Sequence, residues 1–327
     1  MRCIVTGGAG FIGSHLVDRL LVDGHQVVVL DNLSTGREEN LPKEYWKLPD
    51  LEFSKQDVAS TPCSLDYKDV DWVFHLAGLA DIVPSIEKPL DYFRANVTGT
   101  VNVLEASRLA GVKRFVYAAS SSCYGIPTEY PTPEEATINP QYPYALTKYL
   151  GEQCIMHWNK VYGLPTISLR LFNVYGPRRR ATGAYGAVMG VFLKQKLEGQ
   201  PFTVVGDGNQ KRDFIYVSDV VDAFVKAVES NMSGEILNIG SMNPQSINYL
   251  VELLGGSVVY TPERPGEPKM THASNLNAYC KLGWEPRVSF EEGIKVTLEH
   301  IEDLRDAPLW TPEKIDKATS EWFRRLR

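Results

Sequence analysis

A glycine-rich turn near the start of the chain limits the possible folds more than any other feature of the sequence. The turn reads Gly7-Gly8-Ala9-Gly10-Phe11-Ile12-Gly13, and it joins an apolar run at Arg2–Thr6 to a helical pattern at Phe11–Gly24. Glycines at these spacings permit a tight turn and let the backbone approach a pyrophosphate, which the N-terminus of the following helix favours. A strand, such a turn and a helix in this order predict the first βα unit of a dinucleotide-binding domain.

The rest of the N-terminal half alternates between predicted strands and predicted helices. Strands are expected at Gln26–Asp31, Leu51–Ser54, Asp71–Leu76, Lys113–Ser120 and Pro165–Phe172, and helices at Tyr92–Gly111 and Tyr144–Gly163. Several strands are continuous apolar runs, which is typical of strands buried on both faces. The alternation predicts an α/β fold with a Rossmann-like, doubly wound parallel sheet.

The composition changes near Gly176, where glycine, proline and charged residues become more frequent and the segments shorten. Two further helices are expected there, at Val217–Ser230 and Phe290–Leu304. We expect residues 1–175 to form the dinucleotide-binding domain and residues 176–327 a smaller mixed α/β lobe. A segment near 213–240 is expected to return to the first domain. The charged tail, 303–327, carries a stripe of Trp310, Trp322 and Phe323 and is expected to pack against the body.

The overall composition excludes several classes of protein. Of 327 residues, 43% are hydrophobic and 23% charged, as in a folded globular protein. The net charge of -6 argues against a basic nucleic-acid-binding surface. The five cysteines lack CxxC spacing, so a zinc site or secreted disulfide framework is not expected, and a reducing, cytoplasmic compartment is. No apolar run approaches the roughly 20 residues that span a membrane, and the early first strand leaves no room for a signal peptide.

An acidic residue ends the second predicted strand and supports a dinucleotide site. Asp31 follows Gly13 by 18 residues, where its carboxylate can hold the ribose hydroxyls of an adenosine. The same charge would repel a 2′-phosphate, which favours NAD over NADP. The pair Asp57-Val58 follows the third strand, and His75-Leu76-Ala77-Gly78 ends the fourth at the same edge of the sheet. For His75 we expect a structural role rather than that of a base or metal ligand.

A serine, a tyrosine and a lysine form a candidate catalytic set. Tyr144 and Lys148 are four residues apart, so a helix beginning near Tyr144 places both on one face. A tyrosine, with a pKa of about 10, is a poor base at neutral pH. A nearby ammonium and a nicotinamide cation would lower that pKa and let the tyrosine accept a hydroxyl proton. Ser120 ends the fifth strand and can hydrogen-bond the reacting oxygen. Each motif alone also occurs as an ordinary helix pair or strand-end loop.

Together these residues resemble the extended short-chain dehydrogenase/reductase family, and within it the NAD-dependent nucleotide-sugar epimerases and dehydratases, closest to the UDP-hexose 4-epimerases. The resemblance covers nearly the whole chain. Besides the motifs above it includes Asp31-Asn32-Leu33-Ser34-Thr35-Gly36, Tyr124-Gly125, Arg170-Leu171-Phe172-Asn173-Val174-Tyr175-Gly176-Pro177, Gly206-Asp207-Gly208, Lys211-Arg212-Asp213-Phe214 and Arg264-Pro265-Gly266-Glu267.

The resemblance implies NAD as cofactor and two groups of binding residues. The cofactor contacts would be Gly7, Gly10, Phe11, Ile12, Gly13, Asp31, Asn32, Ser34, Thr35, Gly36, Asp57, Val58, Leu76, Ala77, Gly78, Asn96, Tyr144 and Lys148. The substrate contacts would be Ser120, Ser121, Ser122, Asn173, Phe202, Thr203, Val204, Arg212, Arg264, Glu267 and Thr271.

The resemblance also implies what each substrate contact does. Asn173 would contact the diphosphate, and Arg212 and Arg264 would pair with its charges. The segment Phe202–Val204 would lie along the nucleobase, and Glu267 would accept the ribose hydroxyls of the nucleotide. Thr271, as a small gate, would leave room for an N-acetyl group on the sugar. The run Arg178-Arg179-Arg180 can meet phosphate, although a solvated face is the expected role.

Two serines distinguish the predicted reaction from others in the family. Ser121 and Ser122 stand where the dehydratases carry Asp and Glu, and where the decarboxylases carry Glu at the second position. Without an acid for elimination, the pattern resembles the 4-epimerases. We expect Tyr144, aided by Ser120, to take the proton of the sugar's 4-hydroxyl. C4 would give its hydride to NAD, and the hydride would return to the opposite face of a transient 4-keto sugar.

Three alternatives stay open at this point. The same fold supports dehydratases, decarboxylases and reductases, and also epimerases at C2 or at C3 and C5. A catalytically silent NAD or nucleotide sensor is a third. The family also implies a homodimer whose interface is a four-helix arrangement built from Tyr92–Gly111 and Tyr144–Gly163.

Overall fold

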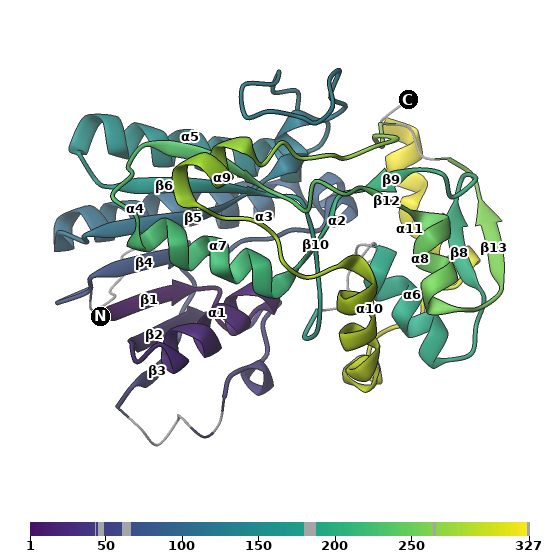
Figure 1. Cartoon of the computed structure of the whole chain (residues 1–327), viewed down its shortest axis with the longest axis horizontal. Coiled ribbons are helices and arrows are strands. Elements are labelled where there is room, and N and C mark those ends of the chain that lie inside the picture. The colour runs from purple at the N-terminus through teal and green to yellow at the C-terminus, as the bar shows by residue number, and fades with distance from the viewer. Residues whose placement is uncertain (43, 45–48, 61–66, 180–187, 264–265, 326–327) are drawn as a thin grey trace.

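A seven-stranded parallel sheet forms the centre of the computed structural model, which describes residues 1–42, 44, 49–60, 67–179, 188–263 and 266–325 (Figure 1). Its strand order is β11-β6-β5-β4-β1-β2-β3, and every neighbouring pair is parallel. The strands are β1 (Arg2–Thr6), β2 (Gln26–Asp31), β3 (Leu51–Lys55), β4 (Trp72–His75), β5 (Arg114–Ser120), β6 (Thr166–Leu171) and β11 (Glu235–Ile239). The predicted Rossmann-like fold is confirmed.

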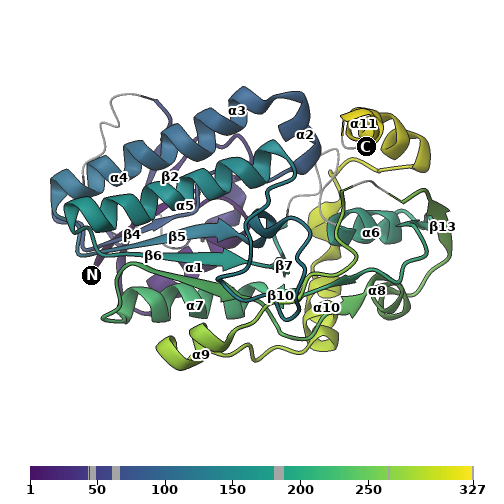
Figure 2. The same cartoon turned by 90° about the horizontal axis from the view of Figure 1, so that it is seen from above.

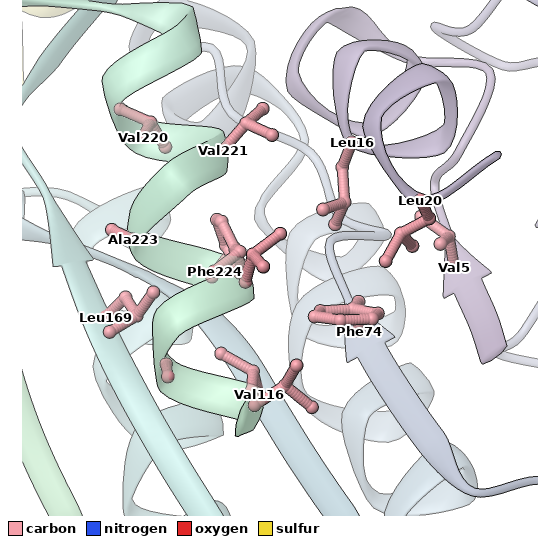
Figure 3. Close-up of a cluster of buried hydrophobic side chains, with 14 of the residues drawn as sticks. Val5, Leu16, Leu20, Phe74, Val116, Leu169, Val220, Val221, Ala223 and Phe224 are labelled. Atoms are coloured by element: carbon pink, nitrogen blue, oxygen red, sulfur yellow. The ribbon is translucent and has the colours of Figure 1, made fainter. Parts of the chain in front are cut away.

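Helices cover both faces of this sheet (Figure 2). One face carries α4 (Gly99–Ala110) and α5 (Pro143–Tyr162), and the other carries α1 (Phe11–Val22) and α7 (Val217–Glu229). Between the sheet and the second pair lies an apolar core in which Leu16 and Phe224 contact the layer that holds Phe74 (Figure 3). Helices on both faces explain why the strands read as continuous apolar runs.

The helix predicted at Tyr92–Gly111 consists of three pieces. The chain turns through α3 (Pro89–Phe93), a π-helical turn at Arg94–Thr98, and then α4. A π turn shifts the residues that face the sheet, and here it carries Asn96, which is 1% exposed. Gly111 and Gly163 both adopt left-handed conformations and end α4 and α5, as their positions predict.

A second layer of structure lies beyond the carboxyl ends of the strands. Its core packs α6 (Val188–Leu197), α8 (Ile247–Leu254) and α10 (Phe290–Glu299) around the parallel pair β8 (Phe202–Val205) and β13 (Val258–Thr261). Two small pairs join it to the sheet layer: β7 (Asn173–Tyr175) with β10 (Phe214–Tyr216), and β9 (Lys211–Arg212) with β12 (Gln245–Ser246). The remaining helices are α2 (Ile82–Glu87), α9 (Leu276–Leu282) and α11 (Pro312–Arg325).

The chain passes between the two layers more than once. After residue 176 it enters the smaller layer, but α7 packs against α1 and β11 joins the sheet beside β6. These two elements fall in the segment near 213–240 for which the sequence predicts a return. No helix in the described part of the chain is long and apolar enough to cross a membrane.

Candidate active site

The glycine turn leaves room only for backbone. A Cβ on Gly7, whose φ is +69°, would lie 2.7 Å from the backbone nitrogen of Ala77, and one on Gly13 would lie 2.2 Å from the carbonyl oxygen of Gly7. Gly10 is the N-cap of α1 and offers no side-chain acceptor to the first turn. The free N–H groups of this helix end therefore have no side-chain cap, which suits the pyrophosphate of a dinucleotide.

Asp31 lies at the carboxyl end of β2, where the sequence places it. Its two carboxylate oxygens accept the backbone N–H groups of Ala9 and Leu33, at 3.0 and 2.8 Å. Burial raises the pKa of Asp31, and these two hydrogen bonds oppose the rise. The carboxylate is thus fixed beside the glycine turn, and Gly36 is needed opposite it because a Cβ there would lie 2.8 Å from Asp31 Oδ2. Asn32, Ser34 and Thr35 are exposed in the loop between these two residues.

Two other predicted cofactor contacts have protein partners in this structure. Asp57 pairs with Arg94 at 2.6 Å and accepts the N–H of Ala59, while Val58 is buried behind it. Asn96 accepts the N–H of Leu79 and donates to its carbonyl. A second N–H of the Asn96 amide donates to Thr147. These bonds tie the loop after Gly78 to α5, and direct contact of Asn96 with a cofactor stays a prediction.

His75 is held as a neutral, structural side chain. Thr100 donates its hydroxyl proton to the carbonyl of Asn96, so His75 Nε2 donates to Thr100, at 2.9 Å. Thr6 accepts the N–H of Ala77, so its own proton goes to His75 Nδ1 at 2.7 Å. Complete burial lowers the pKa of His75 to about 3. A ring with both nitrogens engaged and no charge supports the structural role that we expected.

Ser120 and Tyr144 meet at the carboxyl edge of the sheet. Ser120 is the last residue of β5, and Tyr144 stands in the first turn of α5 after a proline at its first position. The Tyr144 hydroxyl donates to Ser120 Oγ at 3.1 Å, and Ser120 Oγ lies 2.9 Å from Ser122 Oγ. A chain of three hydroxyl groups therefore leads from the tyrosine, along which a proton can pass.

Lys148 follows one turn later but does not pair with Tyr144 in this structure. Its ammonium lies 4.3 Å from the centre of the Tyr117 ring, close to Gly78. Burial lowers the pKa of Lys148 to about 7, with Glu152 opposing the change. Burial also raises the pKa of Tyr144, which the hydroxyl groups of Ser120 and Ser122 partly offset. The lowering that the sequence predicts for Tyr144 is therefore not produced by the side chains alone.

A cavity of about 450 Å³ joins these groups to the smaller layer. At one end it reaches the start of α1 and the loop after β4, and at the other it reaches β8, β9 and α6. The residues of the predicted sites that line it are Phe11, Ile12, Leu76, Gly78, Ser120, Ser121, Ser122, Tyr144, Lys148, Asn173, Thr203, Arg212, Glu267 and Thr271. Residues from the sheet layer and the smaller layer thus face one space.

The polar side chains at the end of the cavity near β8 and β9 form hydrogen bonds within the protein. Arg212 donates to Glu267 at 2.6 Å, in a pair whose arginine side chain is 9% exposed. Thr271 accepts the N–H of Asp213 and donates to Asn173 Oδ1 at 2.8 Å. The predicted contacts for the diphosphate and for the ribose are therefore neighbours, as these two parts of a nucleotide are. Arg264 lies outside the described residues.

Strand β8 corrects one part of the prediction. Phe202 and Val204 were expected to lie along the nucleobase, but they are 1% and 0% exposed in the core of the smaller layer. Phe202 stacks on Phe192 with ring centres 5.1 Å apart. Because side chains alternate along a strand, Thr203 and Val205 face the cavity instead. The side chains of β8 that line the cavity are therefore those of its second and fourth residues.

Several cavity residues were not predicted. Arg179 lines the cavity, with its guanidinium 5.6 Å from the ring centre of Phe11, and it donates to the carbonyl of Val174. From the sequence, this arginine run is expected on a solvated face. Tyr142 stacks on Tyr144 with ring planes 5° apart. Tyr142 directly precedes the proline that begins α5, and this position could have indicated that it lies close to Tyr144. The part of the chain that the structure describes contains no cluster of three or more His, Cys, Asp or Glu side chains that could hold a metal ion.

Comparison with known proteins identifies the family. The model of the NAD dependent epimerase/dehydratase family matches residues 3–240. The chain belongs to this family. UDP-glucose 4-epimerase of Mycolicibacterium smegmatis is 40% identical over 309 residues, which cover 91% of this chain and 98% of that protein.

Other relatives show the range of reactions in the family. The crystal structure of UDP-glucose 4-epimerase from Thermotoga maritima with UDP-glucose has a TM-score of 0.87 and 36% identity, covering 94% of this chain and 100% of that one. UDP-glucuronic acid decarboxylase 1 of Xenopus tropicalis is 34% identical over 335 residues, covering 97% of this chain and 77% of that protein. Proteins similar to this chain over most of its length thus include both epimerases and a decarboxylase.

Proposed function

We propose that this protein is an NAD-dependent epimerase that inverts C4 of a UDP-hexose or a UDP-N-acetylhexosamine. The observation that carries the proposal is the hydroxyl chain of Tyr144, Ser120 and Ser122 in the wall of a cavity that reaches both the glycine turn and β8. One end of this cavity suits a dinucleotide, and the other carries the arginine, amide and carboxylate groups that a nucleotide sugar needs.

The glycine turn, the start of α1 and Asp31 would hold NAD. When bound, NAD supplies an acceptor for the hydride of C4 and returns that hydride later in the cycle. With its own proton lost beforehand, Tyr144 would act as the phenolate and take the proton of the 4-hydroxyl. Ser120, whose Oγ lies 3.1 Å from the Tyr144 hydroxyl oxygen, would hydrogen-bond the same sugar oxygen. After the 4-keto sugar has rotated in the pocket, Tyr144 gives the proton back to the oxygen on C4. No group on the protein is consumed in the cycle. Arg212 and Asn173 keep the nucleotide in place while the sugar rotates.

The resemblance implies that the rival reactions use acidic side chains at two positions where this chain has serines. Ser121 and Ser122 line the cavity where the elimination or decarboxylation chemistry of the relatives requires carboxylic acids. The Xenopus relative supports a decarboxylase as the second candidate. A silent nucleotide sensor would not need the intact hydrogen bond between Tyr144 and Ser120.

Nuclear magnetic resonance tests the proposal. The purified protein with NAD is incubated separately with UDP-glucose, UDP-N-acetylglucosamine and UDP-glucuronic acid, and the anomeric proton signals are followed. We expect the C4 epimer of at least one sugar nucleotide, with no net formation of NADH. Carbon dioxide release, a stable 4-keto product or binding without any turnover would each contradict the assignment.

We further propose a homodimer, built through α3, α4 and α5. These helices expose large apolar side chains at Leu90, Phe93, Leu109, Leu146, Val161 and Tyr162. An apolar surface shared by neighbouring helices supports association with a second copy. Light scattering after size exclusion should give twice the mass of one chain, and the mass of a single chain would contradict it.

The two layers of the structure line different ends of the cavity. We propose that the sheet layer with α7 and β11 is the cofactor domain and that the smaller layer is the nucleotide-sugar lobe.

The free thiols of Cys3 and Cys123 are buried and that of Cys280 is exposed. A protein with unpaired cysteines suits the reducing cytoplasm, where we propose that it acts.

A further inference from the structure

The C-terminal segment crosses the cavity from the smaller layer to the sheet layer. It first contacts α6, where Lys194 donates to the carbonyl of Arg305 at 2.6 Å and Gln195 donates to the carbonyl of Trp310 at 2.8 Å. It then forms α11, which packs against α2 beside the start of α5, and the two views agree on this placement (Figures 1 and 2). Because α2 follows directly after the cavity residues Ala80 and Asp81, α11 reaches the wall nearest the catalytic groups.

The amphipathic pattern of α11 shows which of its faces is turned inward. Ile315, Thr319 and Trp322 are buried at helical spacing, and Trp322 is 1% exposed although it lies five residues from the end of the chain. Glu321 and Arg324 pair with each other on the outer surface. Ile315, Trp322 and the preceding Trp310 all line the cavity.

Trp322 is separated from the catalytic tyrosine by a single aromatic ring. Its ring centre lies 6.2 Å from that of Tyr142, and Tyr142 lies 6.4 Å from Tyr144 in a parallel stack. This part of the wall therefore adjoins the sugar rather than the nucleobase, which belongs near Thr203. At the other end of the segment, Trp310 Nε1 is buried without a hydrogen-bond partner among the described residues.

We propose that the C-terminal segment from Trp310 to Trp322 is part of the substrate site and that Trp322 sets how much bulk the sugar can carry near the reacting carbon. The proposal rests on the proposed function for the identity of the ligand. A bulky, buried indole beside Tyr142 fills space that a smaller side chain would leave to the sugar, and it keeps water from the hydroxyl chain of Tyr144. Trp322 is a specificity-determining residue in this account, not a catalytic one.

Three variants test the role of Trp322, and a fourth tests Trp310. In Trp322→Leu we expect kcat/KM for the preferred UDP-hexose to fall about tenfold, the size of effect that a lost apolar contact produces. The ratio of kcat/KM for a bulkier UDP-sugar to that for the preferred one should rise, and Trp322→Phe should restore most of the loss. Phe323→Ala removes a neighbouring aromatic ring of α11 that does not line the cavity, and it should leave both values within twofold of wild type. Trp310→Phe, which lacks the indole N–H, should weaken binding of UDP itself.

A binding experiment keeps the two proposals apart. Hydrogen exchange of the full chain with NAD is compared in the presence of UDP and of UDP-glucose. We expect the amides of 312–325 to be protected by the sugar nucleotide more than by UDP. Equal exchange in all states, or an unchanged sugar preference in folded Trp322→Leu, would overturn the role of α11. Protection of α11 without any epimer formed would keep that role and overturn the proposed reaction instead.

Discussion

The two walls of the cavity are built by different means. The wall that we propose to be catalytic, the catalytic wall, carries Ser120 at the end of a parallel strand and Tyr144 and Lys148 in the first turns of a long helix. The wall that we propose binds the nucleotide, the nucleotide wall, contains two side-chain pairs whose members are far apart in the sequence: Arg212 with Glu267 and Thr271 with Asn173. A backbone ladder keeps its geometry when one side chain changes, whereas a side-chain network does not.

This difference implies that substitutions in the two walls change different kinetic constants. A change in the catalytic wall should remove a proton-transfer group and leave the nucleotide in place, so kcat falls and KM does not. A change in the nucleotide wall should disturb several partners at once and raise KM. Each prediction below tests this division.

The largest effect is expected for Tyr144→Phe. Loss of the hydroxyl removes the only proton acceptor that the proposed mechanism uses, and kcat should fall by about 10²- to 10⁴-fold. Affinity for UDP, measured by calorimetry, should stay within twofold, because Tyr144 belongs to the catalytic wall. Tyr279→Phe, at an exposed tyrosine of α9 that does not line the cavity, is the matched control and should behave as wild type. Full turnover by Tyr144→Phe would end the assignment of this residue as the base.

A smaller effect on binding is expected for Arg212→Ala. The change leaves the Glu267 carboxylate without its partner and next to an anionic ligand. KM for the UDP-sugar should rise about 10- to 100-fold, with kcat nearly unchanged. The double variant with Glu267→Gln should lose less than the sum of the two single changes, because the two residues are coupled. Lys281→Met breaks an exposed ion pair with Glu235 and should leave KM unaltered. A large loss of kcat in Arg212→Ala would break the division between the walls.

The sequence was sufficient to predict which elements carry the residues of the proposed catalytic wall, because the signals for them are local. A strand end, a proline and the spacing of Tyr144 and Lys148 together place the side chains. The parallel pairing of β5 with its neighbours brings Ser120 to the same edge of the sheet. Even β6 and β2 begin and end within one residue of their predicted bounds. The π-helical turn at Arg94–Thr98 and the seventh strand were not predicted, since neither has a distinctive local pattern.

The nucleotide wall could be predicted only in part. Both faces of β8 are largely apolar, so the alternation along Phe202–Val205 could not show which face meets the core. The arginine run after Pro177 gave no reason to choose Arg179 as a cavity residue. The stripe on the C-terminal tail predicted packing against the body, but not that Trp322 would reach Tyr142, the neighbour of Tyr144. In each case the missing information is a long-range contact.

The charge of Lys148 gives a prediction about stability. Burial lowers the pKa of Lys148 to about 7, below its unfolded value of 10.5. Between these two pH values the unfolded chain holds a proton that the folded chain does not, so stability attributable to Lys148 rises with pH. Without ligands, wild type should be less stable than Lys148→Met at pH 7, and the gap in unfolding free energy should narrow by about 1–3 kcal/mol by pH 9.5. Denaturant titrations measure this, with the exposed Lys160→Met as control. A gap that is constant with pH would show that Lys148 keeps its charge in the folded protein.

The finest test concerns neighbouring residues of one strand. Thr203 Oγ1 accepts a hydrogen bond from Gln195 at 2.8 Å and faces the cavity, whereas Val204 lies in the core. Thr203→Val should raise KM two- to tenfold, the size expected for loss of one hydrogen bond of about 0.5–1.5 kcal/mol from the Thr203 hydroxyl to the ligand. It should also lower the unfolding free energy by about 1 kcal/mol, because Gln195 loses a buried partner. Val204→Ala should lower the unfolding free energy by about 1–3 kcal/mol and leave KM within twofold. Kinetics and denaturant melts on the same two variants decide the matter. If Val204→Ala raises KM and Thr203→Val only destabilises, β8 faces the opposite way, and the nucleotide wall must be rebuilt around Phe202 and Val204.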